Sequence, residues 1–217
     1  MLRLFRMNNS LFDDDGTFDK QLVLVDGERR EKVNALAVRE KKNASLAAGV
    51  ILPLALKECG ICGTVKIEGG RWDKPRLTSP KGVYFNLSHS HGWTVLALSD
   101  REVGVDIERI KPVDMRLAKR FFADGEWAQI EAAGDGAEAL FYRFWTVKEA
   151  YLKALGTGLN RPLNSFTVHF TAGGAKIDDP ECDEVWLVSE FSDTEGYAVA
   201  CCAKEYAPDE DIFEIKL

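Results

Sequence analysis

The sequence of 217 residues has no apolar run approaching the ~20 residues that a membrane-spanning helix requires. Its first residues, MLRLFRMNNSLFDDDG, lack the apolar stretch and cleavage site of a secretory signal peptide. We therefore expect a cytoplasmic protein that does not associate with membranes. The 46% of hydrophobic residues is enough to build a core, either as one large domain or as two small ones.

Cysteine is scarce and odd in number, with five in the chain. An odd count in a chain of this length argues against a disulfide framework. Cys59 and Cys62 form a CxxC pair, but no second pair follows at zinc-finger spacing. Cys201 and Cys202 are adjacent on an expected strand, so their side chains should point to opposite faces. We expect buried, reduced thiols for most of them, and a redox or metal role for the CxxC pair is the alternative.

An excess of positive charge is also missing. The formal net charge is −7, which argues against general nucleic-acid binding. The distribution is uneven, because residues 1–102 carry +3 and residues 103–217 carry −10. A mildly basic half joined to an acidic half suits an anionic ligand on one side and a cation on the other. Ordinary surface variation explains the same numbers.

Apolar periodicity predicts an α+β protein in which strands and helices occur in two similar series. Both halves have the order strand, helices, strand pair, which predicts two α+β subdomains, 1–102 and 103–217. The helix over 26–56 is expected to break at Asn43, with a kink at Pro53. The expected strands are 2–7, 83–90, 93–99, 103–108, 166–170, 184–191 and 197–204, and a loop is expected over 69–82. The remaining helices are 44–59, 114–130 and 137–156, with a break at Asp124-Gly125 as an alternative within 114–130.

Two carboxylates stand out in the stretch VGVDIE. Asp106 and Glu108 lie two apart on a strand, so both side chains emerge on one face while Ile107 faces the other. A solvated strand face is the ordinary explanation. The functional alternative is a hard divalent cation, since Mg²⁺ binds carboxylate oxygens together with substrate phosphates and would remove the repulsion.

The stretch FWTVKEAYLKALGTGL carries a second group of charges. Helical spacing places Trp145, Glu149 and Lys153 on one face, with Lys148 on its flank. An ion pair between Glu149 and Lys153 is the ordinary explanation, worth about 0.2–0.5 kcal/mol. In the functional alternative Glu149 is a third metal ligand, and the two lysines reach phosphate oxygens.

A third group lies in FNLSHSHGW, where Ser88 and His89 are adjacent and point apart on a strand. Without a GxSxG turn, a hydrolase triad has little support here. The N-terminal half also contains scattered cations that are either solvated or arranged around the phosphates of an anionic ligand. These are Arg29, Lys32, Lys41, Lys42 and Lys74.

FNLSHS, VGVDIE and the WxxKEAxxK block resemble the signature motifs of 4′-phosphopantetheinyl transferases. The length resembles the large, surfactin-synthetase-activating (Sfp-like) subclass, and the likeness extends over roughly residues 20–204. The resemblance implies a monomeric pseudo-dimer of two similar α+β subdomains with the active site in the cleft between them. Residues 1–102 would bind coenzyme A, and residues 103–217 would hold the metal site and the catalytic helix.

The resemblance also implies a reaction. The 4′-phosphopantetheine arm of coenzyme A would pass to a serine of an apo acyl, polyketide or peptidyl carrier protein, releasing adenosine 3′,5′-bisphosphate. Asp106, Glu108 and Glu149 would bind Mg²⁺, or Mn²⁺, and Glu149 would deprotonate the serine. Lys153, assisted by Lys148, would stabilise the pyrophosphate charge. The residues implied to line the coenzyme A site are Arg29, Lys32, Ser45, Lys74, Ser88, His89, Lys148 and Lys153, with His89 at the 3′-phosphate.

The sequence departs from the family pattern at three positions: Ala44 stands where Arg is frequent, Arg29 where Lys is frequent, and Asp73 where Gly is usual. An acidic carrier protein would dock on a basic and apolar segment, whereas a plain amphipathic helix is the alternative. The expected docking residues are Met115, Arg116, Lys119, Arg120 and Phe121. Two other functions remain open at this point, an inactive module that binds coenzyme A and a metal-dependent phosphohydrolase.

Overall fold

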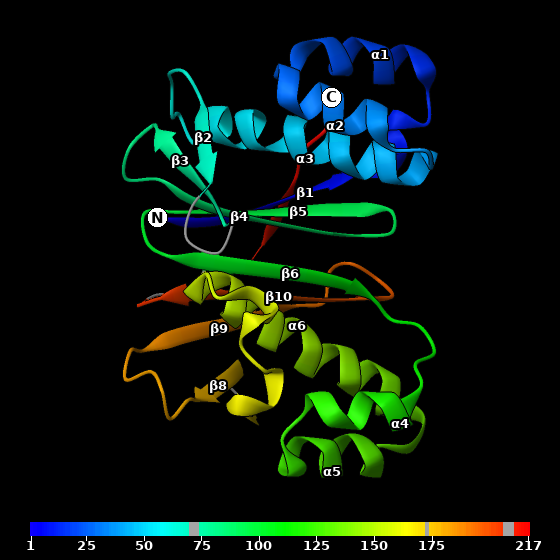
Figure 1. Ribbon diagram of the computed structural model, residues 1–217, viewed down its shortest axis with the longest axis vertical. Helices are drawn as coiled ribbons and strands as arrows, with labels where there is room; N and C mark the ends of the chain where they lie inside the picture. Colours follow the sequence, from blue (N-terminus) through cyan, green and yellow to red (C-terminus); the bar gives the residue numbers. More distant parts are fainter. Residues whose placement is uncertain (70–73, 172–173, 206–210) are drawn as a thin grey trace.

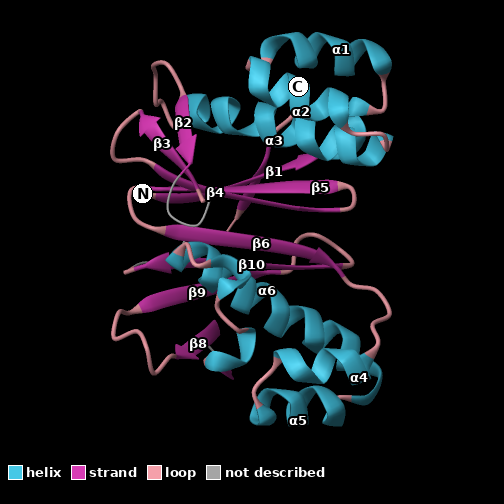
Figure 2. Cartoon of the chain, viewed as in Figure 1, coloured by secondary structure: helices cyan, strands magenta, loops and turns pink. Residues whose placement is uncertain are grey.

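The computed structural model describes residues 1–69, 74–171, 174–205 and 211–217. Two β-sheets lie face to face in the middle of the molecule, and helices cover the outer face of each (Figures 1 and 2). Buried apolar side chains fill three layers, one between the sheets and one under each set of helices. The α+β class predicted from the sequence is confirmed.

The first sheet has the strand order β11-β1-β5-β4, in which β11 runs parallel to β1 and the other pairs are antiparallel. Leu96 and Leu98 of β5 pack toward the helices, while Val95 and Ala97 pack toward the second sheet. Its elements are β1 Leu2–Asn8, α1 Asp15–Leu24, α2 Gly27–Ala35, α3 Arg39–Glu58, β4 Tyr84–Ser90, β5 Trp93–Ser99 and β11 Ile212–Glu214.

The second sheet has the order β6-β10-β9-β8-β7, and α6 packs along β6 and β10. Cys201 and Cys202 are buried on opposite faces of β10, as the strand pattern predicted, and all five cysteines are free thiols. Its elements are β6 Val103–Arg109, α4 Met115–Ala118, α5 Asp124–Ala132, α6 Ala137–Leu155, β7 Thr167–Thr171, β8 Gly174–Asp178, β9 Trp186–Phe191 and β10 Tyr197–Lys204.

The helix break expected at Asn43 is wrong. The break lies at residues 36–38, and α3 continues through Asn43 and Pro53. Asn43 is buried, and its amide donates to Asp13 Oδ1 at 2.7 Å while its Oδ1 accepts from Arg39 Nε at 3.1 Å. These tertiary hydrogen bonds occupy a side chain that would otherwise compete with the helix backbone.

Other differences from the predicted elements are local. The helix expected over 114–130 is split, with α4 ending at Ala118 and α5 beginning at Asp124. The segment expected to be a loop after residue 69 contains β3, Pro75–Ser79, which pairs with β2, Lys66–Gly69, as a separate hairpin. The sequence patterns missed α1, β8 and β11. Since β11 returns to the first sheet, the chain division near residue 102 stays a prediction.

None of the helices in the described parts of the chain is both long enough and apolar enough to cross a bilayer.

Candidate active site

The edge strands β4 and β6 of the two sheets meet along a seam made by side chains. Asn86 Oδ1 accepts the Val105 backbone N–H at 2.9 Å. Two residues further along β4, Ser88 Oγ donates to Asp106 Oδ1 at 2.7 Å. These two bonds align the Ser88 hydroxyl of one sheet with the Asp106 carboxylate of the other.

Ser90 continues this seam. Its Oγ donates to Glu108 Oε2 at 2.9 Å and accepts the Arg109 backbone N–H at 3.1 Å. Ser90 had no predicted role, although the FNLSHS alternation places it on the same face as Ser88. The seam therefore orients both β6 carboxylates before any ligand is considered.

Lys153 reaches the same site from α6. Its Nζ lies 2.6 Å from Asp106 Oδ1, 2.9 Å from Ser88 Oγ and 3.2 Å from the Val105 carbonyl oxygen. The approach depends on Gly104, where an added Cβ would lie 2.0 Å from the Ala150 carbonyl oxygen. The absence of a side chain at Gly104 brings the helix backbone against the strand, and the sequence analysis gave this glycine no role.

The three candidate carboxylates influence one another. Burial, and then the Asp106 charge, raises the pKa of Glu149 to about 7. Burial and the same charge also raise the pKa of Glu108. Asp106 Oδ2 and Glu149 Oε1 are buried and have no hydrogen-bond partner. The cluster therefore contains buried negative charge that Lys153 alone does not neutralise.

The donor chemistry of this cluster suits a hard cation. Two buried carboxylate oxygens without partners are the ligands that Mg²⁺ or Mn²⁺ accepts, and a cation would lower the cost of ionising Glu149. Within the described residues, however, no three His, Cys, Asp or Glu side chains are arranged as a metal-holding group. Lys153 occupies the Oδ1 side of Asp106. The carboxylate oxygens of this cluster are suitable ligands for such a metal ion, but the side chains must rearrange before they can bind it together.

The N-terminal half supplies a cationic region beside this cluster. Burial, followed by the charges of Lys153 and Lys32, lowers the pKa of His89. Lys32 on α2 therefore lies close enough to influence the same ring as Lys153 on α6. The ring is placed by β4, on the strand face opposite Ser88. His89 thus lies within electrostatic range of the cation on α2 and of Lys153 in the cluster.

Arg29 and Ser45 lie on the two helices that border this region. The Arg29 side chain packs on Gly49 of α3, where an added Cβ would lie 2.8 Å from Arg29 Cγ. Lys32 follows Arg29 by three residues and Ser45 precedes Gly49 by four, so each pair shares a helix face. Ser45 Oγ is buried and has no hydrogen-bond partner. Ala44 beside it is buried, and Asp73 lies outside the described residues.

Lys148 is located away from this cluster, which corrects the expectation that it contacts phosphate. Its Nζ lies 2.8 Å from Glu126 Oε1 and donates to the carbonyl oxygens of Leu163 and Phe166 at 2.9 and 2.8 Å. Both side chains of the ion pair are fully buried. The three ammonium donors are therefore used inside the C-terminal core, where Lys148 cannot reach a ligand.

Lys74 is also bound by groups of the protein. Its Nζ donates to Glu102 Oε2, the Val103 carbonyl oxygen and the Ala154 carbonyl oxygen, each at 3.1 Å. In this structure all three donors of the ammonium group are used by protein acceptors at the start of β6 and the end of α6. The expectation that Lys74 lines the coenzyme A site stays a prediction.

The segment expected to dock a carrier protein forms α4 and the turn after it. Arg116, Lys119 and Arg120 are exposed, and Met115 is half-buried. Phe121 is half-buried and packs edge-on against Trp145 of α6, with ring centroids 5.5 Å apart. The segment thus carries three exposed cations and an aromatic contact with α6. Lys41 is exposed and Lys42 half-buried on α3.

Comparison with known proteins gives one family. The model of the 4′-phosphopantetheinyl transferase superfamily matches residues 102–202. A 4′-phosphopantetheinyl transferase of Bacillus subtilis is 31% identical over 192 residues, covering 87% of this chain and 86% of the relative. Another, Sfp of Bacillus subtilis strain 168, is 28% identical over 198 residues, covering 89% and 88%. A solved holo-(acyl-carrier-protein) synthase from Bacillus anthracis, in complex with CoA (3′,5′-ADP), aligns at a TM-score of 0.42 with 22% identity, over 49% of this chain and 96% of that chain.

Proposed function

The chain belongs to the 4′-phosphopantetheinyl transferases, in the Sfp-like subclass, and from this premise we propose its reaction. It transfers the 4′-phosphopantetheine arm of coenzyme A to a serine of an apo carrier protein and releases adenosine 3′,5′-bisphosphate. The main support is the cluster in which Lys153 lies 2.6 Å from Asp106 beside Glu108 and Glu149, together with Lys32, whose charge lowers the pKa of His89. Cations at one end and carboxylates at the other suit a phosphate-rich ligand whose pyrophosphate must be bound and cleaved.

We propose that the two subdomains, 1–102 and 103–217, form a monomeric, cytoplasmic pseudo-dimer with the ligand at the β4–β6 seam. In the N-terminal half, Arg29, Lys32, Ser45 and His89 surround the 3′-phosphate and adenosine. The orphaned Ser45 hydroxyl supports this, because a buried donor without a partner is costly unless a ligand accepts from it. Ser88 and Lys153 contact the pyrophosphate from the seam and from α6.

In the proposed reaction Glu149 accepts the proton of the carrier serine. Burial and the Asp106 charge raise its pKa to about 7 in the absence of a cation, which gives this carboxylate the proton affinity of a base. Asp106, Glu108 and Glu149 would hold Mg²⁺, or Mn²⁺, which when bound supplies positive charge for the pyrophosphate oxygens. Lys153 shifts from Asp106 toward the leaving phosphate and stabilises the charge that accumulates there.

The carrier protein would dock at α4. Arg116, Lys119 and Arg120 offer positive charge to an acidic partner, and Met115 and Phe121 offer apolar contact area. In the chain, the segment follows β6 after the short connection 110–114.

The test incubates the protein with coenzyme A, Mg²⁺ and an apo carrier protein, and weighs the carrier by mass spectrometry. A gain of one phosphopantetheine supports the proposal. Binding of coenzyme A with no gain on fatty-acid, polyketide or peptide carriers would instead favour an inactive binding module. Consumption of coenzyme A without a carrier would favour a phosphohydrolase. Glu131→Gln, an exposed position on α5, serves as the matched control for Glu149→Gln.

A further inference from the structure

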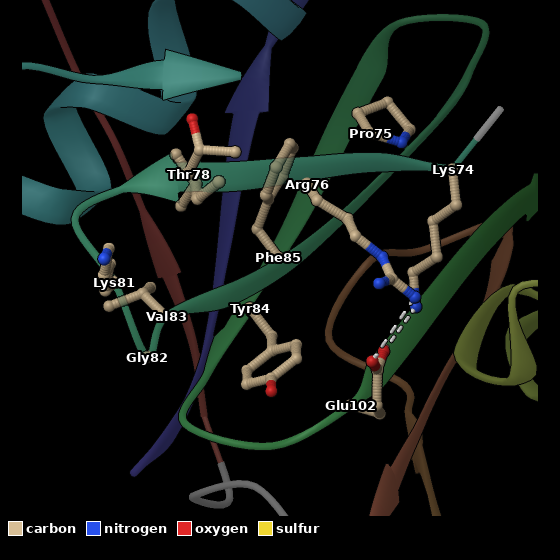
Figure 3. A pocket seen from close by; sticks show the side chains of 11 residues that line it. Lys74, Pro75, Arg76, Thr78, Lys81, Gly82, Val83, Tyr84, Phe85 and Glu102 are labelled. Atoms are coloured by element: carbon tan, nitrogen blue, oxygen red, sulfur yellow. Dashed lines mark hydrogen bonds and ion pairs between the residues drawn. The ribbon is translucent and has the colours of Figure 1, made fainter. Parts of the chain in front are cut away.

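The Lys74 side chain joins three segments that are far apart in the sequence. Lys74 directly precedes β3 in the chain. Its ammonium group contacts Glu102 and Val103 at the start of β6 and Ala154 at the end of α6. Figure 3 shows Lys74 and Glu102 directed toward each other at the border of a pocket of about 320 Å³. Only 10% of the Lys74 side chain is exposed.

The contact with Ala154 completes the end of α6. Gly156, with φ of 73°, turns the chain, and the N–H groups of Gly156 and Thr157 return to the carbonyls of Lys153 and Leu152. The last carbonyls of a helix lack partners within the helix, and they carry partial negative charge that favours a cation. Lys74 supplies both a donor and a positive charge to the carbonyl oxygen of Ala154.

The same ammonium fixes the strand that carries the carboxylates. Val103, which accepts from Lys74, precedes Asp106 by three residues on β6. Ala154, the other backbone acceptor, directly follows Lys153. One ammonium group therefore binds the backbone next to Lys153 on α6 and the backbone three residues before Asp106 on β6. Lys153 and Asp106 themselves are 2.6 Å apart.

We propose that Lys74 is a positioning residue, which locks the end of α6 against the start of β6 and so aligns Lys153 with Asp106. The inference rests on the proposed transferase function and assigns Lys74 a role within it other than ligand contact. Burial lowers the pKa of Lys74, and the Glu102 charge offsets part of that effect. We call the contacts of Lys74 with Glu102, Val103 and Ala154 the lock. Arg76 lies 3.9 Å from Glu102, is more than half exposed, and is not part of it.

The lock predicts a particular kinetic signature. Misalignment of Lys153 weakens stabilisation of the transition state, so Lys74→Met should lower kcat, by up to ~100-fold if the displacement approaches 1 Å. KM for coenzyme A should stay within about threefold of wild type, because a residue that acts by aligning Lys153 with Asp106 changes the transition state more than ground-state binding. Lys74→Arg keeps charge and donors and should recover most of kcat. Arg76→Met, in the strand that directly follows Lys74, is the matched control and should behave as wild type.

Steady-state kinetics of these three variants tests the inference. A raised KM with unchanged kcat in Lys74→Met would mean a ligand contact and overturn it, as would unchanged values of both. If Lys74→Met does not fold, Glu102→Gln removes the charge partner alone and should lower kcat by a smaller factor in the same way. Hydrogen exchange of residues 149–155 tests the lock without any carrier: faster exchange in Lys74→Met supports it, and equal exchange overturns it. Failure of the transferase function would instead appear as a wild-type protein that modifies no carrier.

Discussion

Ser88 donates a hydrogen bond of 2.7 Å to Asp106 across the seam between the two sheets. The same hydroxyl accepts from Lys153 at 2.9 Å, so one serine holds a carboxylate and an ammonium in a fixed relation. Asp106 is 3% exposed, which makes its partners costly to lose. The first sheet thus orients the charged groups of the second, although it provides none of the carboxylates.

Ser88→Ala should therefore impair transfer without unfolding the protein. Both charged neighbours lose a partner, and losing a hydrogen bond to a charged group costs about 1.5–3 kcal/mol. We expect kcat to fall roughly tenfold or more, since about 1.4 kcal/mol corresponds to a factor of ten. Carrier modification and urea unfolding measure the two effects, with exposed Ser192→Ala as control. Unchanged kcat would show that Lys153 and Asp106 align without the hydroxyl.

Asp106→Ala and Glu149→Ala should each abolish transfer and leave the fold intact. Each substitution removes a carboxylate with a buried oxygen that receives no hydrogen bond, Asp106 Oδ2 or Glu149 Oε1. Neither side chain is needed to fill the apolar core. Transfer is followed by carrier mass at varied Mg²⁺, and folding by circular dichroism. If Asp106→Ala retained near wild-type turnover at limiting Mg²⁺, the metal assignment would be wrong.

His89 should report the arrival of an anion at the cationic region. Burial, Lys153 and Lys32 hold its pKa below the usual ~6.5. The folded state therefore favours the neutral ring. The stability that this preference contributes is complete above pH ~6.5, and it is lost as the pH falls through the pKa of His89 in the folded protein. Adenosine 3′,5′-bisphosphate would offset the two lysine charges, and the pKa should rise. Asp106, the other charged neighbour, acts in the same direction with or without the ligand.

Imidazole NMR titration measures this pKa with and without the nucleotide. The chain contains three histidines, and His89→Gln identifies the relevant signal. A pKa that does not move at saturating nucleotide would place the ligand away from His89.

The buried pair of Lys148 and Glu126 should contribute to stability and not to ligand binding. Removing one partner of a fully buried ion pair typically costs about 3–5 kcal/mol, because it leaves an unpaired charge. Lys148→Met should lower the free energy of unfolding by such an amount, and adding Glu126→Gln should recover part of it. A double-mutant cycle in urea gives the coupling. A stable Lys148→Met protein that fails to transfer would restore Lys148 to the phosphate site.

The sequence made part of this site predictable. Alternation on a strand placed Asp106 and Glu108 together, and helical spacing placed Glu149 with Lys153. The same helical spacing put Lys148 on the flank of that face, so its burial against Glu126 agrees with the pattern and differs only from the role implied by resemblance. Short-range periodicity is therefore a sufficient guide to which side chains share a face.

What periodicity could not supply is pairing between distant segments. Strand β11 joins β1 from the other end of the chain, and no local pattern specifies that partner. Asn43 remains helical because Asp13 accepts from its amide, a tertiary contact that overrides its local preference. The three acceptors of Lys74 likewise come from β6 and α6, so a cation that looks free in the sequence is fully occupied in the fold.

Gly104 should be the most restrictive position on β6. An added Cβ would lie 2.0 Å from the Ala150 carbonyl oxygen and 2.4 Å from the Ala154 backbone nitrogen, both backbone atoms that cannot rotate away. Gly104→Ala must therefore push α6 off the strand, which separates Lys153 from Asp106 and opens the core beneath. We expect both a large loss of stability in urea and loss of transfer. Gly125→Ala, where nothing lies within 4 Å of the added Cβ, is the matched control and should be close to neutral. Near-normal transfer by Gly104→Ala would show that the helix need not lie this close to β6 for catalysis.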